Sequence, residues 1–231
     1  MGRHRGDPPS TRRSSMRTRR LVTAAVAVAL GATTLAAAPA SASSGSSKPT
    51  GTRSLAAVLT SDGNTFDHNW YDYDIVTEAV LAVLAAKPNS PVKVLADGTT
   101  PVTAFLPDDR SFQVLAYDLT KRWPSTEKKT FEALVAAVGV DAIEQVLLYH
   151  VVPGATITKR DAVKANGAAL TTAQGGTVTV KVLNKWIPII ELKDQDRNDV
   201  NPFVNPRRFD INKGNKQIAH GIVFVLRPLD L

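Results

Sequence analysis

The sequence predicts an α+β domain, and two observations support this class. Apolar residues recur at helical spacing in several segments between residues 54 and 147, whereas short apolar runs separated by glycine-rich turns dominate after Gly154. Helices that precede strands in this order pack against one face or edge of a sheet instead of alternating with parallel strands. No segment repeats, so we expect one domain.

Helices are predicted where a capping side chain precedes an apolar run of helical spacing. The second helix should end before Pro88, and Gly139 should separate the fourth helix from the fifth. In chain order, the expected caps are Ser54, Asp74, Asp108 or Asp109, Thr126 and Asp141.

Strands are predicted where short apolar or alternating stretches lie between turn signals. The first two should pair as a hairpin across Asp97–Gly98, and Pro188 places its strand at an edge or bulge of the sheet. An exposed edge of this kind can recruit a partner strand. The predicted strands are residues 92–95, 102–106, 168–172, 177–182, 186–192, 209–211 and 222–227.

Residues 1–42 have the features of an export signal. Arginines precede an apolar run at residues 21–35, and small residues lead to an expected cleavage site after Ala42. A signal of ordinary length would begin at Met16, which we expect to be the true start. The pair Arg19–Arg20 permits twin-arginine export, although the general secretory route fits the following residues better. An uncleaved anchor is the alternative, but the run is shorter than the roughly 20 residues that a spanning helix needs.

A flexible Ser- and Gly-rich linker is expected at residues 43–52, followed by the folded domain at residues 53–231. We expect no stable membrane span after cleavage of the signal. The chain contains no Cys, which excludes both a disulfide framework and a lipid-modified N-terminal Cys. Stability therefore has to come from the hydrophobic core.

The net charge of +7 does not indicate nucleic-acid binding, because the charge is concentrated before the domain. Residues 1–42 contain seven arginines and one acidic residue, Asp7, which leaves 21 Lys and Arg against 20 Asp and Glu in the rest of the chain. A nucleic-acid-binding domain needs a concentrated basic face that displaces counterions from phosphates. We therefore expect no nucleic-acid partner.

Three blocks of sequence, taken in order, carry a family resemblance. They are residues 103–112 (TAFLPDDRSF), 146–158 (VLLYHVVPGATIT) and 218–225 (IAHGIVFV). Together they resemble the conserved blocks of fasciclin (FAS1) domains. The resemblance implies a FAS1 fold over residues 53–231, a compact wedge of two small β-sheets flanked by several α-helices. It also implies a non-catalytic adhesion module that is secreted or held in the cell envelope, and the Ala-rich signal favours a bacterial source.

The resemblance further implies an interaction site, because a Tyr-His pair flanked by aliphatic residues is implicated in receptor binding by related animal domains. The expected interaction face consists of Tyr149, His150, Leu147, Leu148, Val151 and Val152. The alternative is a structural role. Neighbours on a strand point to opposite faces, so at least one of the pair should lie inward, where hydrogen bonds to the backbone would stabilise the interior.

The residues that enzymes use for catalysis do not form a recognisable constellation. Helix capping explains Asp108-Asp109-Arg110 better than acid–base chemistry does, because acidic side chains accept hydrogen bonds from free N–H groups at a helix start. There is no Gly-x-Ser-x-Gly, phosphate loop or dinucleotide fingerprint, and the His residues lack zinc-binding spacing. We predict no enzymatic activity and no cofactor. Beyond the signal, the His residues are His68, His150 and His220.

Residues 194–205 match a calcium-loop pattern only in part. Suitable side chains occupy the first, third and fifth positions, but the sixth, which needs Gly, is Asp199 and the twelfth, which needs Glu, is Asn205. We predict no metal site here, with a weak surface calcium site as the alternative. Its candidate ligands are Asp194, Asp196, Asp199 and Asp210.

The segment 66–74 is both aromatic and acidic. We expect Phe66, Trp70 and Tyr73 to anchor it on the core while Asp74 caps the following helix. Exposure of these rings to a sugar or protein partner is the alternative.

These observations favour an extracellular or cell-envelope domain that mediates adhesion through a protein or polysaccharide partner. A secreted hydrolase would need a concave pocket that joins acids from distant segments with a perturbed pKa. A binder of a small apolar ligand would need an open cavity between helices and sheet. Both remain alternatives at the level of the sequence.

Overall fold

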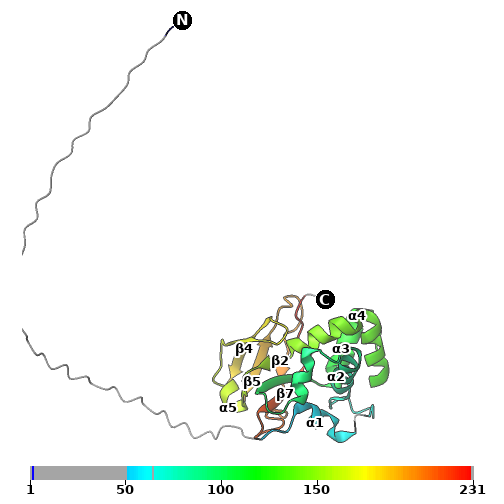
Figure 1. Ribbon diagram of the computed structural model, residues 1–231, viewed down its shortest axis with the longest axis horizontal. Coiled ribbons are helices and arrows are strands. Elements are labelled where there is room, and N and C mark those ends of the chain that lie inside the picture. Colours follow the sequence, from blue (N-terminus) through cyan, green and yellow to red (C-terminus); the bar gives the residue numbers. More distant parts are fainter. Residues whose placement is uncertain (1, 3–50, 64, 230–231) are drawn as a thin grey trace, which may run out of the picture. The chain divides into compact units, whose positions relative to one another are not determined.

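The computed structural model describes residues 2, 51–63 and 65–229 (Figure 1). The predicted export signal and most of the predicted linker therefore fall outside the described residues. The N–H of Gly51 donates to the carbonyl oxygen of Gly214 at 3.0 Å, and its own carbonyl accepts from the N–H of Lys216 at 2.9 Å. Gly51, which the sequence analysis placed in the linker, is therefore paired with the domain.

The helices follow the predicted capping pattern closely. The side chains of Ser54, Asp108 and Thr126 accept hydrogen bonds from the first turns of α1, α3 and α4, as predicted. Asp74 is the first residue of α2 instead of its cap. Gly139 interrupts α4 with φ 75° and ψ 169°, where the sequence predicted a break. The helices are α1 (Leu55–Leu59), η1 (Thr60–Asp62), α2 (Asp74–Ala86), η2 (Pro91–Ala96), α3 (Asp109–Thr120), α4 (Glu127–Tyr149) and α5 (Lys159–Ala162).

No helix in residues 51–63 and 65–229 combines the length and apolar character needed to cross a membrane.

The strands form one mixed sheet in the order β2-β1-β7-β6-β5-β4-β3, in which only β1 and β7 are parallel. The sheet curls until its two ends meet, since the N–H of Ala173, just after β3, donates to Val151 in β2 at 2.7 Å. The strands are β1 (Val102–Pro107), β2 (Val151–Pro153), β3 (Ala169–Thr171), β4 (Thr177–Asn184), β5 (Ile189–Lys193), β6 (Phe203–Val204) and β7 (Gln217–Val223).

The α+β class is confirmed, but several details of the predicted sheet are wrong. Of the predicted strand 209–211 only Ile211 pairs, in an isolated bridge with Ala219, and the predicted strand 222–227 overlaps only the last two residues of β7. Residues 92–95 lie in the 3-10 helix η2, so β1 forms no hairpin and pairs with β2 and β7 instead. Strand β5 lies between β4 and β6, so the predicted edge that could recruit a partner is wrong. Pro188 belongs to the preceding turn, beside a register shift between Val182 and Asn184, which agrees with the other prediction, a bulge. The described strands form one curled sheet in place of the two small sheets that the resemblance implied.

Two hydrophobic cores lie on opposite sides of β1, because successive side chains of a strand point to opposite faces. Val102, Ala104 and Leu106 pack with the helical core formed mainly by α2, α3 and α4. Phe105 packs with the sheet core, which includes Val180 and residues of β5. Helices α2, α3 and α4 accordingly gather on one side of β7, and β4, β5 and α5 on the other (Figure 1).

Candidate functional site

The predicted Tyr–His interaction face lies inside the protein. Tyr149 is 0% exposed and His150 5%, and the four aliphatic neighbours are also buried. The pair does not lie on the strand that the sequence predicted: Tyr149 is the last residue of α4 and His150 its C-cap. The chain at this point enters the space between the two cores, because Tyr149 and Val152 pack in the sheet core and Val151 in the helical core. A face that binds a partner has to be accessible, so the expected surface is wrong for the folded domain. The buried residues are Leu147, Leu148, Tyr149, His150, Val151 and Val152.

Tyr149 joins the end of α4 to the sheet. Its hydroxyl donates to the carbonyl oxygen of Thr177 at 2.8 Å. Its ring lies against Gly176, where a Cβ atom would come within 2.9 Å of the ring. Burial is the main cause that raises the pKa of Tyr149 to about 12. The side chain therefore works as a neutral, hydrogen-bonded part of the sheet core.

His150 joins α4 to the C-terminal segment. Its Nδ1 lies 2.7 Å from the carbonyl oxygen of Val146, and its Nε2 accepts from the N–H of Leu226 at 3.0 Å. Since a carbonyl only accepts, Nδ1 carries the proton and the ring is neutral. Burial lowers the pKa of His150 to about 4, which fixes that neutral state at physiological pH.

His220, in β7, has an equivalent role. Its Nε2 lies 2.8 Å from the carbonyl oxygen of Ile157, and its Nδ1 accepts from the N–H of Asp210 at 3.2 Å. The proton therefore sits on Nε2, and burial lowers the pKa of the ring. His150 and His220 serve separate hydrogen-bond networks, and the described chain does not bring them together into a catalytic or zinc-binding arrangement.

The acidic side chains of the partial calcium-loop pattern pair with an arginine of the same protein. The guanidinium of Arg227 contacts carboxylate oxygens of Asp118 at 2.7 Å, Asp199 at 2.8 Å and Asp196 at 3.5 Å. The backbone N–H of the same residue donates to Asp194 at 2.9 Å. Because a cation of the protein already occupies this loop, the alternative of a surface calcium site here loses its support.

The most exposed aromatic side chain of the described residues lies in the turn between β4 and β5. Trp186 is 97% exposed and Ile187 is 66% exposed. The side-chain oxygen of Asn184 accepts from the N–H groups of Trp186 at 2.9 Å and Ile187 at 3.0 Å, which fixes the turn. Leu183 and Ile189 flank it and are partly exposed. We call residues 183–189 the β4–β5 turn.

Segment 66–74 agrees with the anchoring prediction for two of its three aromatic rings. Phe66 and Tyr73 pack against the helical core, whereas Trp70 is half-buried outside the core clusters. Tyr71, which the sequence did not single out, is 70% exposed.

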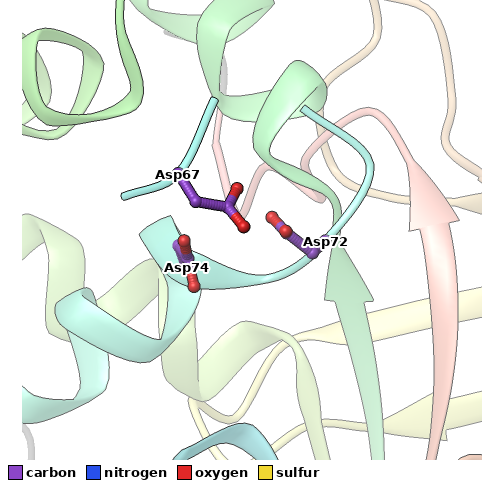
Figure 2. Close-up of side chains that lie close together, drawn as sticks. All are labelled: Asp67, Asp72 and Asp74. Atoms are coloured by element: carbon purple, nitrogen blue, oxygen red, sulfur yellow. The ribbon is translucent and has the colours of Figure 1, made fainter. Parts of the chain in front are cut away.

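Five carboxylates meet at the starts of three helices, and sequence reasoning missed this group. The first residues of α2, α3 and α4 are Asp74, Asp109 and Glu127, and all three are buried. Figure 2 shows Asp67 and Asp72 pointing toward one another beside Asp74. Asp74, Asp109 and Glu127 each look like ordinary helix-start residues, and only the fold reveals that they converge with Asp67 and Asp72 of the preceding loop. We call the group the acidic cluster: Asp67, Asp72, Asp74, Asp109 and Glu127.

Comparison with known families identifies the class of protein that this architecture represents. The Fasciclin domain model matches residues 77–227, which is more than half of the chain. The chain therefore belongs to the Fasciclin domain family. Domains of this family are generally adhesion-related, typically non-enzymatic and often extracellular.

A solved structure is also similar, that of a FAS1 domain pair from the insect cell adhesion molecule fasciclin I. The sequence identity is 19% and the TM-score 0.46, and the match covers 66% of this chain and 46% of that one. The chain thus spans less than half of that structure's length. A search of curated proteins gave no match.

Proposed function

We propose that the protein is exported and acts outside the cell, or in the cell envelope, as a non-catalytic adhesion module. The partner is an extracellular or envelope protein or polysaccharide, and the contact surface is the β4–β5 turn. The observation that carries this proposal is the 97% exposure of Trp186 at the tip of an ordered turn.

Several apolar side chains are grouped at this turn. Single exposed apolar residues are common on soluble proteins, but Trp186 is joined by Ile187, Leu183 and Ile189. Trp is enriched among residues that dominate binding energy, and its flat ring also suits stacking on sugars and apolar protein groups. Asn184 fixes the backbone beneath the ring, which lowers the entropy lost on binding.

The cavities in the two cores are too small to support the alternative function, binding of a small apolar ligand. The cavity in the helical core measures about 40 Å³ and that in the sheet core about 20 Å³. Ligand sites typically measure about 300 Å³ or more. These two cavities are large enough for little more than a water molecule.

The alternative of a hydrolase has a candidate hollow but no free acid in it. An open, polar hollow of about 810 Å³ is lined by residues 193–201. Burial raises the pKa of Asp194 to about 6, yet the acids of this loop come from one segment and are engaged by Arg227. This arrangement supports a structural ion network over an acid–base pair.

The test is attachment of the purified full chain to whole cells and to arrays of polysaccharides and matrix proteins. Trp186→Ala should weaken saturable binding by about tenfold or more, as expected for a central aromatic contact. The matched control is Trp123→Ala, because Trp123 is also exposed, at 52%, but stacks on Tyr117 away from the turn. Equal loss in both variants, or full binding by Trp186→Ala, would exclude the β4–β5 turn as the contact surface. No binding by the wild-type chain would argue against adhesion itself.

A further inference from the structure

The acidic cluster contains two overlapping groups of carboxylates. Asp74, Asp109 and Glu127 each offer an oxygen, and these oxygens all lie within 4.8 Å of one another. Asp67, Asp72 and Asp74 form a second group with the same property, and Asp74 belongs to both. The cluster runs from the exposed Asp67 to the fully buried Asp109, so its inner part is connected to the surface by its own carboxylates.

In two of the buried carboxylates, one oxygen accepts a backbone hydrogen bond and the other oxygen has no hydrogen-bond partner. Oδ1 of Asp109 accepts from the N–H of Ile75 at 2.9 Å, and Oε2 of Glu127 accepts from the N–H of His68 at 3.0 Å. The second oxygen of each, Oδ2 of Asp109 and Oε1 of Glu127, is buried and has no hydrogen-bond partner. The two residues are 0% and 1% exposed, respectively. Buried polar atoms are nearly always partnered, so two unpartnered oxygens in one place call for a ligand.

Three members of the cluster have no cationic side chain paired with them in the part of the chain that the structure describes. Among the described residues, Asp72, Asp109 and Glu127 form no salt bridge. Arg110 hydrogen-bonds Gln113 and lies over the ring of Trp123, 5.2 Å from its centroid.

The other sources of positive charge are weak. The guanidinium of Arg208 donates to the carbonyl oxygen of Tyr71 at 3.4 Å. The starts of α2, α3 and α4 supply partial positive charge, equivalent to roughly half a unit each, against five carboxylates.

We propose that the acidic cluster is a calcium site in which Asp74, Asp109 and Glu127 bind one Ca²⁺, with Asp72 and Asp67 completing the coordination on the solvent side. Carboxylate oxygens are the donors that hard divalent cations prefer. Calcium–oxygen distances of about 2.3–2.6 Å place opposite ligands up to about 5 Å apart, which matches the spacing of both groups. Magnesium demands shorter bonds and a stricter octahedron, so the cluster suits calcium better.

The ion would tie one loop to three helices. Backbone bonds already connect the loop to α3, from the N–H of Asp109 to Asp72 at 3.2 Å and from the N–H of Arg110 to Trp70 at 2.9 Å. Carboxylate ligation adds the starts of α2 and α4 to the same point. The loop carries Tyr71, so calcium would also fix the position of an exposed aromatic side chain.

A proton shared between Asp72 and Asp109 is the competing explanation for the unpaired charge. It leaves the buried Oε1 of Glu127 without a partner, whereas a cation engages both carboxylates. The two explanations differ in their response to calcium: ligation requires deprotonated carboxylates, so binding should release protons.

The experiment is a calcium titration of the chelator-treated full chain by calorimetry at pH 7 and constant ionic strength, with Tm measured in parallel. We expect saturable binding of one ion with a Kd of about 1 mM or tighter, and a Tm that rises with calcium concentration. Glu127→Gln keeps an acceptor for the N–H of His68 but removes the charge, and should weaken binding at least tenfold. The matched control Glu132→Gln changes an exposed acid of the same helix and should bind like the wild type.

A second measurement covers the case in which Glu127→Gln does not fold. Tb³⁺ added to the wild-type chain should emit when tryptophan is excited, because Trp70 lies in the loop that carries Asp67 and Asp72, and calcium should displace it. The proposal is overturned by the absence of saturable calcium binding, or by equal Tm changes with calcium and sodium at matched ionic strength. Unaltered binding by Glu127→Gln, or terbium emission that calcium does not reduce, would overturn it as well.

Discussion

At the residue scale, the buried imidazole of His150 links the protonation of one ring to the stability of the fold. The ring donates to Val146 and accepts from Leu226, so a second proton would break the bond to Leu226 and place a charge in the core. The pKa falls to about 4 in the folded state. The corresponding unfolded value is about 6.5.

The sign of the pH effect follows from these two values. Between pH 4 and 6.5 the unfolded chain binds more protons at this site, so the free energy of unfolding falls as the pH drops through that window. The stabilisation that depends on the neutral ring of His150 is complete above about pH 6.5. By pH 4, roughly 3 kcal/mol of it has been lost. His220, whose pKa is also lowered by burial, acts in the same direction.

Urea unfolding at pH 7 and pH 4.5 tests this prediction. His150→Gln should lower stability at pH 7 and flatten the pH dependence, whereas His68→Gln, which changes an exposed ring, should keep the wild-type dependence. The raised pKa of Asp109 contributes with the opposite sign, because its stabilisation is lost as the pH rises. The comparison of His150→Gln with His68→Gln therefore isolates the effect of His150 on the pH dependence of stability. If His150→Gln kept the pH dependence of the wild type, the link between His150 and that dependence would be contradicted.

At the element scale, α4 is two helical segments joined at Gly139. The backbone angles of Gly139, φ 75° and ψ 169°, lie in a region that is essentially restricted to glycine. A Cβ atom there would meet nothing within 4 Å, so the cost of a side chain is backbone strain alone. Gly139→Ala should lower the free energy of unfolding by about 1–3 kcal/mol.

Chemical denaturation of the Gly139→Ala variant measures this cost, with Ala136→Ser on an exposed face of the same helix as the control. Stability equal to the wild type would mean that the two segments merge into one straight helix when the glycine is absent.

Local signals predicted the helices well because caps and breaks are encoded within a few residues. Ser54, Asp108, Thr126 and Gly139 all have the roles expected from their neighbours. The sheet was harder, because β1 pairs with β7, more than a hundred residues later, and no local pattern specifies that partner. Residues 92–95 are mostly apolar, like a short buried strand, but lie in the 3-10 helix η2.

The candidate sites show the same division between local and long-range information. The Tyr–His pair was identifiable from sequence, but its burial depends on the end of α4 lying between the helical core and the sheet core. The acidic cluster was not identifiable, because it forms only when the starts of α2, α3 and α4 converge.

At the scale of the whole molecule, the two proposed sites belong to different cores. The acidic cluster lies at the starts of helices that build the helical core, whereas β4 and β5, which carry the β4–β5 turn, contribute to the sheet core. Strands β1 and β7 lie between them and pair over six residue positions. This separation predicts that calcium binding and partner attachment are independent.

The double variant Glu127→Gln/Trp186→Ala tests that independence. Effects of distant substitutions without shared partners usually add within about 0.5 kcal/mol, so the double variant should lose calcium as Glu127→Gln does and attachment as Trp186→Ala does. Calorimetry measures the first affinity and the array assay the second, in the presence and absence of calcium. If removal of calcium or Glu127→Gln weakened attachment while Trp186 is intact, the two cores would be coupled across β1 and β7. The contact surface would then have to include the loop that carries Tyr71, because that is the exposed aromatic segment that calcium holds in place.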